Sequence, residues 1–388
     1  MNHTSSSFSS SATGAAPLKI RVAADIGDFS TFWPRSNALR NTSCHAFQCA
    51  DVLEVWLRTI GAARGTKPFF AVIDNDAGAP WLGLPLGIER QRGVRVLTFL
   101  DGGVSDYNAP VIFNTAPLAQ MPKAHEIIDA LTTILPAFDI IRFDKMPEQV
   151  GDHANPLIAE GSSPVAPSGY VVSLDHDWKT YSDTRLPRKR DTLRKRRKLE
   201  SMGELRFVIA ATSEEKQQIL NAMIEQKTAR YVETRGWNGF DRPGYRAYYP
   251  AMTQALGENI HLSALKLDDT FLAAHWGLHL GQRYYELMPS FDQSWQKLSP
   301  GRILTEHLLQ WSFENHKKWF DMGIGDEAYK QEYCDIVLPL HQLVIGQTAR
   351  GRLFLLASER FNHFKSTRAG QWLKSSLRKL MPNLGRPA

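Results

Sequence analysis

The sequence predicts an α/β fold made of two similar halves, each a mostly antiparallel sheet flanked by helices. Three observations lead to this prediction. The chain has 388 residues, of which 43% are hydrophobic, so it can bury more than one core. Short strand patterns alternate with amphipathic helical patterns along the chain. The order of elements in the first half then returns in the second.

The first half is expected over residues 18–150, after a disordered leader at 1–17 that is rich in Ser, Thr and Ala. Apolar residues at helical spacing run up to Gly61, and β-rich runs separated by turn residues follow them. The expected strands are 18–23, 69–73, 81–88, 94–100 and 140–143, and the expected helices are 48–60 and 123–135.

Residues 151–168 contain several Pro, Gly and Ser residues and are expected to form a linker. The second half is expected over 169–350, followed by a basic amphipathic tail at 351–388. Its expected strands are 205–209, 261–267, 271–280, 284–288 and 319–322, and its expected helices are 187–202, 214–232, 245–256 and 302–316.

Both halves share one order: strand, Asp-containing turn, strand, strand, long loop, helix, strand. Residues 70–86 and 265–280 show the similarity best. We interpret it as an internal duplication. Short strand-rich units also produce such matches by chance, so the alternative of two unrelated halves stays open.

The net charge of +6 is unevenly distributed. Segments 185–198 and 350–388 each carry nine basic residues and one acidic residue, and the rest of the chain is net acidic. An acidic body with two basic patches is not the pattern of a general nucleic-acid-binding protein.

The three cysteines do not make a disulfide framework in a chain of this length, which favours a reducing, cytoplasmic location. Cys44 and Cys49 are too far apart for a usual zinc knuckle, so we expect no metal. The sequence has no apolar run of the roughly 20 residues that a membrane-spanning helix requires.

The start of the helix near residue 300 is expected to bind an anion. The first backbone N–H groups of a helix have no intrahelical partner, and the helix dipole places positive charge there. Ser299 suits the N-cap, Pro300 the first turn, and Gly301 a close approach to the backbone. These residues also suit an ordinary helix start, so both explanations remain. The expected binding segment is Leu298, Ser299, Pro300, Gly301, Arg302 and Ile303.

Two further stretches carry a family resemblance. Phe99-Leu100-Asp101-Gly102-Gly103-Val104-Ser105-Asp106-Tyr107 and Phe320-Asp321-Met322-Gly323-Ile324-Gly325-Asp326-Glu327-Ala328-Tyr329-Lys330 are similar to the motifs of CelD-type acyltransferases. These belong to the GNAT superfamily and are related to the FemAB-type tandem-GNAT transferases. The resemblance runs from about Phe47 to Lys330. The usual GNAT pyrophosphate-binding pattern of Arg or Gln, two residues, Gly, one residue, and Gly or Ala is absent, so the match to that helix start is topological.

The resemblance implies two GNAT-like halves and transfer of an acyl group from acetyl-CoA or another acyl-CoA to an amine or hydroxyl. Such a reaction requires oxyanion donors, a base for the nucleophile and an acid for the leaving thiolate. Backbone amides at 287–290 are candidate oxyanion donors. Asp321 and Glu286 are candidate bases, and Tyr285 and Tyr329 are candidate acids. Turn capping, solvent exposure and core packing are the ordinary structural explanations for these side chains.

The charged loop after the last strand is expected to meet a polar substrate. The expected substrate-binding residues are Asp106, Tyr107, Asp326, Glu327 and Lys330. By the resemblance, the acceptor is a sugar, an amino acid or a related metabolite, in cellulose or exopolysaccharide biosynthesis. The second half is expected to be the active one, because the anion-binding helix start lies there.

Two alternatives use the basic patches. Arg190, Arg194 and Arg197 lie on one face of the helix at 187–202, where they can guide either CoA or the aminoacyl-tRNA that Fem-type enzymes use. The tail at 351–388 can lie on an anionic membrane surface at the inner face of the membrane or pack against the protein itself. A third alternative is a non-catalytic accessory protein of polysaccharide synthesis.

Overall fold

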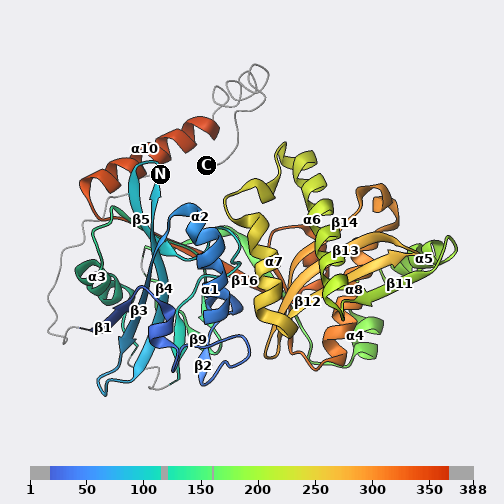
Figure 1. Ribbon diagram of the computed structural model, residues 1–388, viewed down its shortest axis with the longest axis horizontal. Coiled ribbons are helices and arrows are strands. Elements are labelled where there is room, and N and C mark those ends of the chain that lie inside the picture. The colour runs from blue at the N-terminus through green and yellow to red at the C-terminus, as the bar shows by residue number, and fades with distance from the viewer. Residues whose placement is uncertain (1–17, 115–120, 160, 367–388) are drawn as a thin grey trace.

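The computed structural model describes residues 18–114, 121–159 and 161–366. The predicted leader at 1–17 and the end of the predicted tail, 367–388, lie outside these residues. Figure 1 shows two halves side by side with one sheet running through both. In the described part of the chain this sheet has fourteen strands and is flanked by helices. The predicted α/β class is therefore confirmed.

The first half forms one end of the sheet. Its strands in this sheet are mostly antiparallel, but β7 runs parallel to β5. Strands β8 and β9 form a separate two-stranded sheet. A π-helical turn at Leu57–Gly61 connects α1 directly to α2. The elements are β1 (Lys19–Ala23), β2 (Thr42–Ser43), α1 (Ala50–Trp56), α2 (Ala62–Arg64), β3 (Lys67–Asp74), β4 (Pro80–Gln91), β5 (Val94–Phe99), β6 (Val111–Phe113), α3 (Ala124–Ile134), β7 (Ile140–Pro147), β8 (Gln149–Val150) and β9 (His153–Ala154).

The second half repeats this plan at the other end of the sheet. Strands β12, β13 and β14 are antiparallel neighbours, and β15 runs parallel to β14 after helix α8. The same order of three strands, helix and parallel strand thus occurs in both halves. The elements are α4 (Trp178–Thr184), α5 (Lys189–Glu200), β11 (Leu205–Ile209), α6 (Ser213–Arg235), α7 (Tyr245–Leu256), β12 (Ile260–Leu267), β13 (Thr270–Leu280), β14 (Arg283–Phe291), α8 (Pro300–Glu314), β15 (Trp319–Ile324) and α9 (Ala328–Tyr333).

Two long strands, β10 (Ser163–Ser173) and β16 (Ile336–Gly346), join the halves in the order β7-β16-β10-β15. The sequence did not predict them: the end of the expected linker is the start of β10, and no strand was expected at β16. Pro164, Pro167 and Gly169 are uncommon inside strands, so the sequence of β10 does not show a strand pattern. The pairing of β10 with β16 also shifts register between Val165 and Gly169. The end of the chain therefore returns to pair with the first half.

Three large hydrophobic clusters stabilise the fold. One lies between the halves and combines α1 and the first-half strands with α6, α7 and β13, including Trp56, Phe70, Met223 and Trp276. A second packs α3 against the outer first-half sheet, and a third packs α8 against the second-half sheet. The shared cluster means that α6 and α7 lie on one sheet face and α8 on the other.

Helix α10 (Ala349–Ser366) begins the predicted basic tail. Phe354 and Leu355 pack against a small cluster of Val94, Val96 and Ile140. Leu353 is 67% exposed, so this helix is both docked and partly apolar toward solvent. No helix in the described ranges combines the length and apolarity that crossing a membrane requires.

Candidate active site

The candidate site begins where parallel strands β14 and β15 separate. Their register pairs Arg283 with Trp319 and ends at Tyr285 and Asp321. Beyond this point β14 stays paired only with β13, as far as Phe291, and β15 with β10, as far as Ile324. The edge of β14 that faces β15 therefore has no strand partner from Glu286 onward, and a cleft opens there.

Two residues in the diverging segments explain why the strands separate. Pro289 on β14 has no backbone N–H to donate to a neighbouring strand. Gly323 on β15 has φ +70°, a left-handed conformation that leaves the extended strand path. A side chain at Gly323 would also collide with the Asp106 carboxylate. The glycine thus allows the first-half loop at 101–107 to reach the cleft.

The β14–β15 cleft has a volume of about 730 Å³. It is lined by β14, the end of β15, helices α6 and α9, and the first turn of α8. Its charged lining residues are Asp106, Lys227, Arg230, Arg235, Glu286, Arg302, Glu327 and Lys330. Cations outnumber carboxylates in this set, which suits an anionic ligand.

Helix α8 opens into the cleft at its N-terminus. Ser299, at the N-cap, has φ +51°, and its side chain makes no capping hydrogen bond. Instead its hydroxyl accepts from Lys195 Nζ at 2.9 Å, which brings basic helix α5 to this end of α8. By contrast, Glu126 fills the corresponding end of α3, where its carboxylate accepts from Lys123 N at 2.7 Å. Of the two helix starts, only that of α8 is free of its own capping carboxylate.

Only part of the expected anion-binding segment at 298–303 lines the cleft. Gly301 and Arg302 line the cleft, whereas Leu298, Ser299, Pro300 and Ile303 do not, and Pro300 and Ile303 are buried. Arg302 donates to Glu332 at 2.6 Å and to Tyr333 at 3.2 Å. Its charge is therefore already compensated, and the backbone of the first turn is the feature left to meet an anion.

Glu286 lies at the point where β14 leaves β15. One carboxylate oxygen accepts from Thr305 Oγ1 at 2.8 Å, and the other is buried with no hydrogen-bond partner among the described residues. Burial raises the pKa of Glu286 to about 7. Lys227 on α6 lines the same cleft, and desolvation lowers its pKa to about 8. Both groups can thus change protonation near neutral pH.

Asp106 comes from the first half and lies at the mouth of the cleft. Its Oδ2 accepts from Ile324 N at 3.3 Å. Burial raises the pKa of Asp106 to about 6, opposed by the charges of Lys145 and Lys330. A carboxylate with one weak backbone partner and a raised pKa is suited to accept a proton.

Asp321, Tyr107 and Tyr285 are buried below the cleft, and none of them lines it. Asp321 accepts from Tyr107 Oη at 2.8 Å, from Arg283 Nη1 at 2.7 Å and from Gly323 N at 2.9 Å. Tyr285 packs against Phe47 and hydrogen bonds to Ala46 N through its hydroxyl. These side chains join the two halves and make their hydrogen bonds within the fold.

In the charged loop after β15, some side chains line the cleft and one contacts β10 instead. Glu327, Tyr329 and Lys330 line the cleft, where Lys330 donates to Ile324 O at 2.8 Å and pairs with Glu327 at 3.1 Å. Burial raises the pKa of Tyr329 well above its usual value, which keeps its proton on. Asp326 points elsewhere and accepts from Ser168 N and Tyr170 Oη.

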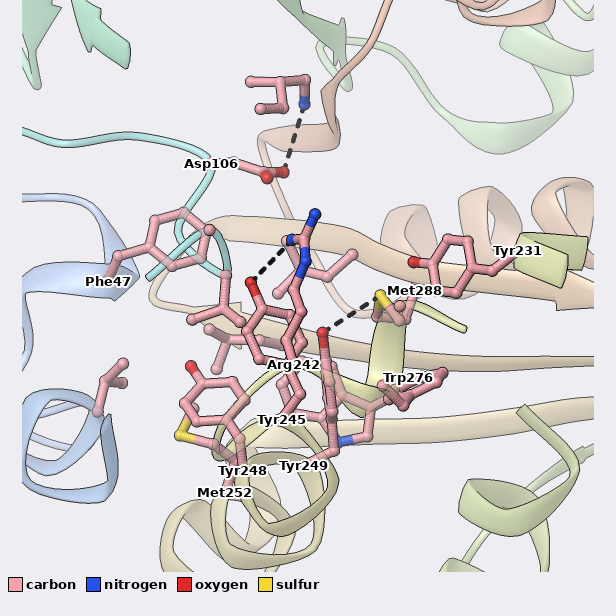
Figure 2. Close-up of a pocket in the computed structure, with 18 of the residues that line it drawn as sticks. Phe47, Asp106, Tyr231, Arg242, Tyr245, Tyr248, Tyr249, Met252, Trp276 and Met288 are labelled. Atoms are coloured by element: carbon pink, nitrogen blue, oxygen red, sulfur yellow. Dashed lines mark hydrogen bonds between the residues drawn. The ribbon is translucent and has the colours of Figure 1, made fainter. Parts of the chain in front are cut away.

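A second cavity of about 350 Å³ adjoins the cleft and is rich in aromatic side chains. Helix α7 supplies Tyr245, Tyr248 and Tyr249, and β13 supplies Trp276. Figure 2 shows the guanidinium end of Arg242 between these rings, which lie below it, and Asp106, which lies above it. Asp106 lines both spaces, so a ligand in this aromatic cavity can meet one in the cleft at this carboxylate.

In the described residues of the first half, side chains occupy the corresponding place between the parallel strands. There β5 and β7 are the parallel pair, and Phe99 packs against Phe143 with ring centroids 5.1 Å apart. Lys145 forms an ion pair with Asp101 at 2.7 Å. Side chains therefore fill the space between these strands.

Sequence reasoning missed Lys227 and the aromatic cavity. Ile219, Met223 and Lys227 are four residues apart, so this lysine continues an apolar helix face, and that position was a usable signal. The aromatic cavity had no such signal, because it combines a first-half loop with α6, α7 and β13. Among the described residues, no three His, Cys, Asp or Glu side chains are grouped as a metal site.

Comparisons with known proteins agree with this geometry. Residues 187–331 match the family described as an acetyltransferase (GNAT) domain. No curated protein gives a significant match. The structure of FemX is 11% identical, covers 81% of this chain and 94% of its own, and has a TM-score of 0.55.

Two other similar structures have lower scores. A tandem GNAT protein from the clavulanic acid biosynthesis pathway is 12% identical, with 85% and 99% coverage and a TM-score of 0.46. L-PGS from Bacillus licheniformis is 14% identical, with 78% and 94% coverage and a TM-score of 0.47. Residues 187–331 thus match a GNAT acetyltransferase domain, and the fold that contains them is similar to that of FemX.

Proposed function

We propose that this protein is an acyltransferase that takes an acyl group from acyl-CoA in the β14–β15 cleft. The observation that carries this proposal is the first turn of α8, which opens into the cleft without a capping side chain. Free backbone N–H groups and the helix dipole favour a pyrophosphate at this position. The GNAT domain match covers this helix.

Side chains around the cleft support the same donor. Lys227 on α6 supplies positive charge for phosphate groups. Lys195 at the α8 start and Arg230 on α6 lie nearby, where they also pair with Asp191 and Glu233, each at 2.9 Å. The unpaired edge of β14 from Glu286 onward supplies backbone groups for the donor's thioester end and for the developing oxyanion.

In the proposed reaction, the acceptor lies in the aromatic cavity and its nucleophilic nitrogen or oxygen faces Asp106. Asp106 accepts the proton while the nucleophile attacks the thioester carbonyl carbon. The tetrahedral intermediate collapses, the carbon–sulfur bond breaks, and the CoA thiolate leaves and is protonated. Tyr329 lines the cleft and stays protonated at neutral pH, so it is placed to donate a hydrogen bond to that thiolate. Because burial raises the pKa of Tyr329, the proton that the thiolate takes comes from solvent.

Calorimetric titration with acetyl-CoA and free CoA tests the donor site directly. We expect the wild type to bind both, Gly301→Asp to lose binding at least tenfold, and the isosteric Gly301→Asn to lose much less. The Asp and Asn side chains meet Phe291 similarly, since a Cβ at position 301 lies 3.1 Å from its ring, so the comparison isolates the charge. A folded wild type that binds neither compound would overturn the acyl-CoA proposal.

One observation favours a second donor, an aminoacyl-tRNA. Arg190, Arg194 and Arg197 on α5 are exposed beside the cleft entrance that Lys195 marks, and they can meet a polynucleotide backbone. Turnover that is abolished by ribonuclease and by neutralising all three arginines would favour this donor.

The biological setting, cellulose or exopolysaccharide synthesis, is proposed from the sequence resemblance to CelD-type proteins. Attachment of α10 to an anionic membrane surface is proposed with it, since Leu353 and Leu356 are exposed next to Arg350, Arg352 and Arg360.

A further inference from the structure

We infer that the acceptor is an α-amino acid with a large apolar side chain, held in the aromatic cavity with its amine at Asp106 and its carboxylate between Arg235 and Arg242. This inference rests on the proposed acyl transfer and specifies its acceptor. It follows from how charge and apolar surface are distributed around the cavity.

The polar end of the cavity has two cations without an anionic partner. Arg235 and Arg242 both line it, and over the described ranges neither has a carboxylate within ion-pair distance. Asp241, next to Arg242 in sequence, pairs instead with Arg246 at 2.9 Å. Both guanidinium groups lie near Tyr231, whose pKa is raised by burial and held down by these two charges. Together they make a place for one carboxylate.

Among the residues that the structure describes, the single carboxylate that lines this cavity is Asp106. It also lines the cleft, so a group bound to it lies next to the proposed donor. An ammonium group fits this carboxylate. It loses one proton to solvent to become the nucleophilic amine, and Asp106 then accepts the second proton during attack. The cavity therefore offers one anionic and two cationic groups, which matches the two charged ends of an amino acid.

The other end of the cavity is apolar. Phe240, Met252, Trp276 and Leu278 are almost fully buried there. Two of the nearby polar atoms are engaged, since Trp276 Nε1 donates to Thr253 at 2.9 Å and Tyr245 Oη donates to Gly102 O. A sugar ring would bury hydroxyl groups against this surface with few partners, whereas an aromatic or large aliphatic side chain needs none.

An acyl chain of the donor could also occupy the apolar end. Such a chain would leave Arg235 and Arg242 without an anion, so the charge distribution favours the amino acid. The two occupants require different probes.

Binding of four small molecules to the full-length protein tests the inference without turnover. Phenylalanine has all three recognition features, phenethylamine lacks the carboxylate, 3-phenylpropionate lacks the amine, and glycine lacks the apolar side chain. We expect calorimetry to give the tightest binding for phenylalanine and roughly tenfold or weaker binding for each of the others, because a charge-assisted contact or buried ring is lost.

Variants assign each feature to a residue. Arg242→Gln should remove most of the preference for phenylalanine over phenethylamine, and Asp106→Asn should remove the preference over 3-phenylpropionate. Arg206→Gln, at an exposed position of β11 outside the cavity, is the control and should leave both preferences unchanged. Preserved CoA binding in all variants shows that they are folded and separates this test from the donor test.

The inference is overturned if phenethylamine or glycine binds as well as phenylalanine, or if Arg242→Gln leaves the preference intact. Tighter binding of glucosamine 6-phosphate than of phenylalanine would likewise replace the amino acid by an amino sugar phosphate. Binding of octanoyl-CoA that is much tighter than that of acetyl-CoA and weakened by Trp276→Ala would assign the cavity to the acyl chain.

Discussion

Asp106 and Asp321 lie close together at the junction of the halves, but their surroundings give them different capacities. Asp321 is fully buried and accepts three hydrogen bonds, one of them from the guanidinium of Arg283. Asp106 has one backbone donor and lines both the cleft and the aromatic cavity. The first is suited to hold the halves together, and the second to exchange a proton.

Asp106→Asn should lower the acyl-transfer rate by about 10²- to 10⁴-fold, because it removes the proposed base. Because the pKa of Asp106 is about 6, the wild-type kcat/KM should fall with decreasing pH below that value, and this limb should be missing in the variant. Steady-state rates between pH 5 and 9 measure both effects. Asp269→Asn, on an exposed turn, is the control. A limb near pH 7 that disappears in Glu286→Gln instead would assign the base to Glu286.

Asp321→Ala should cost about 3 kcal/mol or more in the free energy of unfolding, because it leaves the charge of Arg283 largely buried without its partner. Tyr107→Phe removes one hydrogen bond from the same group and should cost about 1 kcal/mol. Urea unfolding measures both values. Wild-type stability in Asp321→Ala, combined with loss of turnover, would return Asp321 to the role of a base that the sequence suggested.

The sequence predicted which residues lie near the site, but it did not predict which of their side chains line the cleft. The resemblance led to Asp106, Glu286 and Tyr329, which line the cleft. It also led to Asp321 and Tyr285, which are buried at the junction. Exposure of a side chain at a strand end depends on what the other half packs against it, and one motif does not contain that information.

The position of helix α7 depends on a single glycine at its start. Gly244 precedes it with φ +81°, and a Cβ at this position would lie 2.6 Å from Ile60 Cα. The helix start therefore touches the backbone of the helical segment that contains Ile60. Three tyrosines of the aromatic cavity follow on α7, so their position depends on this contact.

Gly244→Ala should destabilise the protein by more than the roughly 1 kcal/mol that left-handed backbone strain alone costs, because the helices must also move apart. Gly65→Ala is the matched control, since Gly65 has φ +64° and open space around its Cβ position. Thermal unfolding of the two variants measures the difference. Equal destabilisation would mean that the α7 contact with Ile60 carries no energy.

Elements with strong local patterns were predicted well. Helix α7 has the predicted bounds, and the other predicted helices and strands lie close to those observed. The strands β10 and β16 were missed because their stability comes from neighbours far away in the chain, including the pairing of Leu343 with Phe143. Their prolines and glycine point locally to a loop, and only the completed sheet outweighs that preference.

The whole molecule is connected more tightly than a pair of separate domains. Strand β16, from the end of the second half, pairs with β7 of the first half. One hydrophobic cluster includes residues from both halves, and hydrogen bonds cross between them, such as Asn259 to Ser36 at 2.8 Å. The predicted division into domains at residues 150 and 350 can be tested by asking whether the two halves unfold together.

We expect the two halves to unfold in one cooperative transition. Leu343 belongs to the second half in sequence but packs in the outer first-half cluster, whereas Leu308 packs in the outer second-half cluster. Leu343→Ala and Leu308→Ala should each cost about 2–5 kcal/mol. Hydrogen exchange at increasing urea concentration, followed for peptides of β4 and β13, reports on each half separately. If the halves are coupled through β16 and the shared cluster, either substitution lowers the midpoint of both peptides equally. Two independent domains would give the opposite pattern, in which Leu343→Ala affects only β4 and Leu308→Ala only β13.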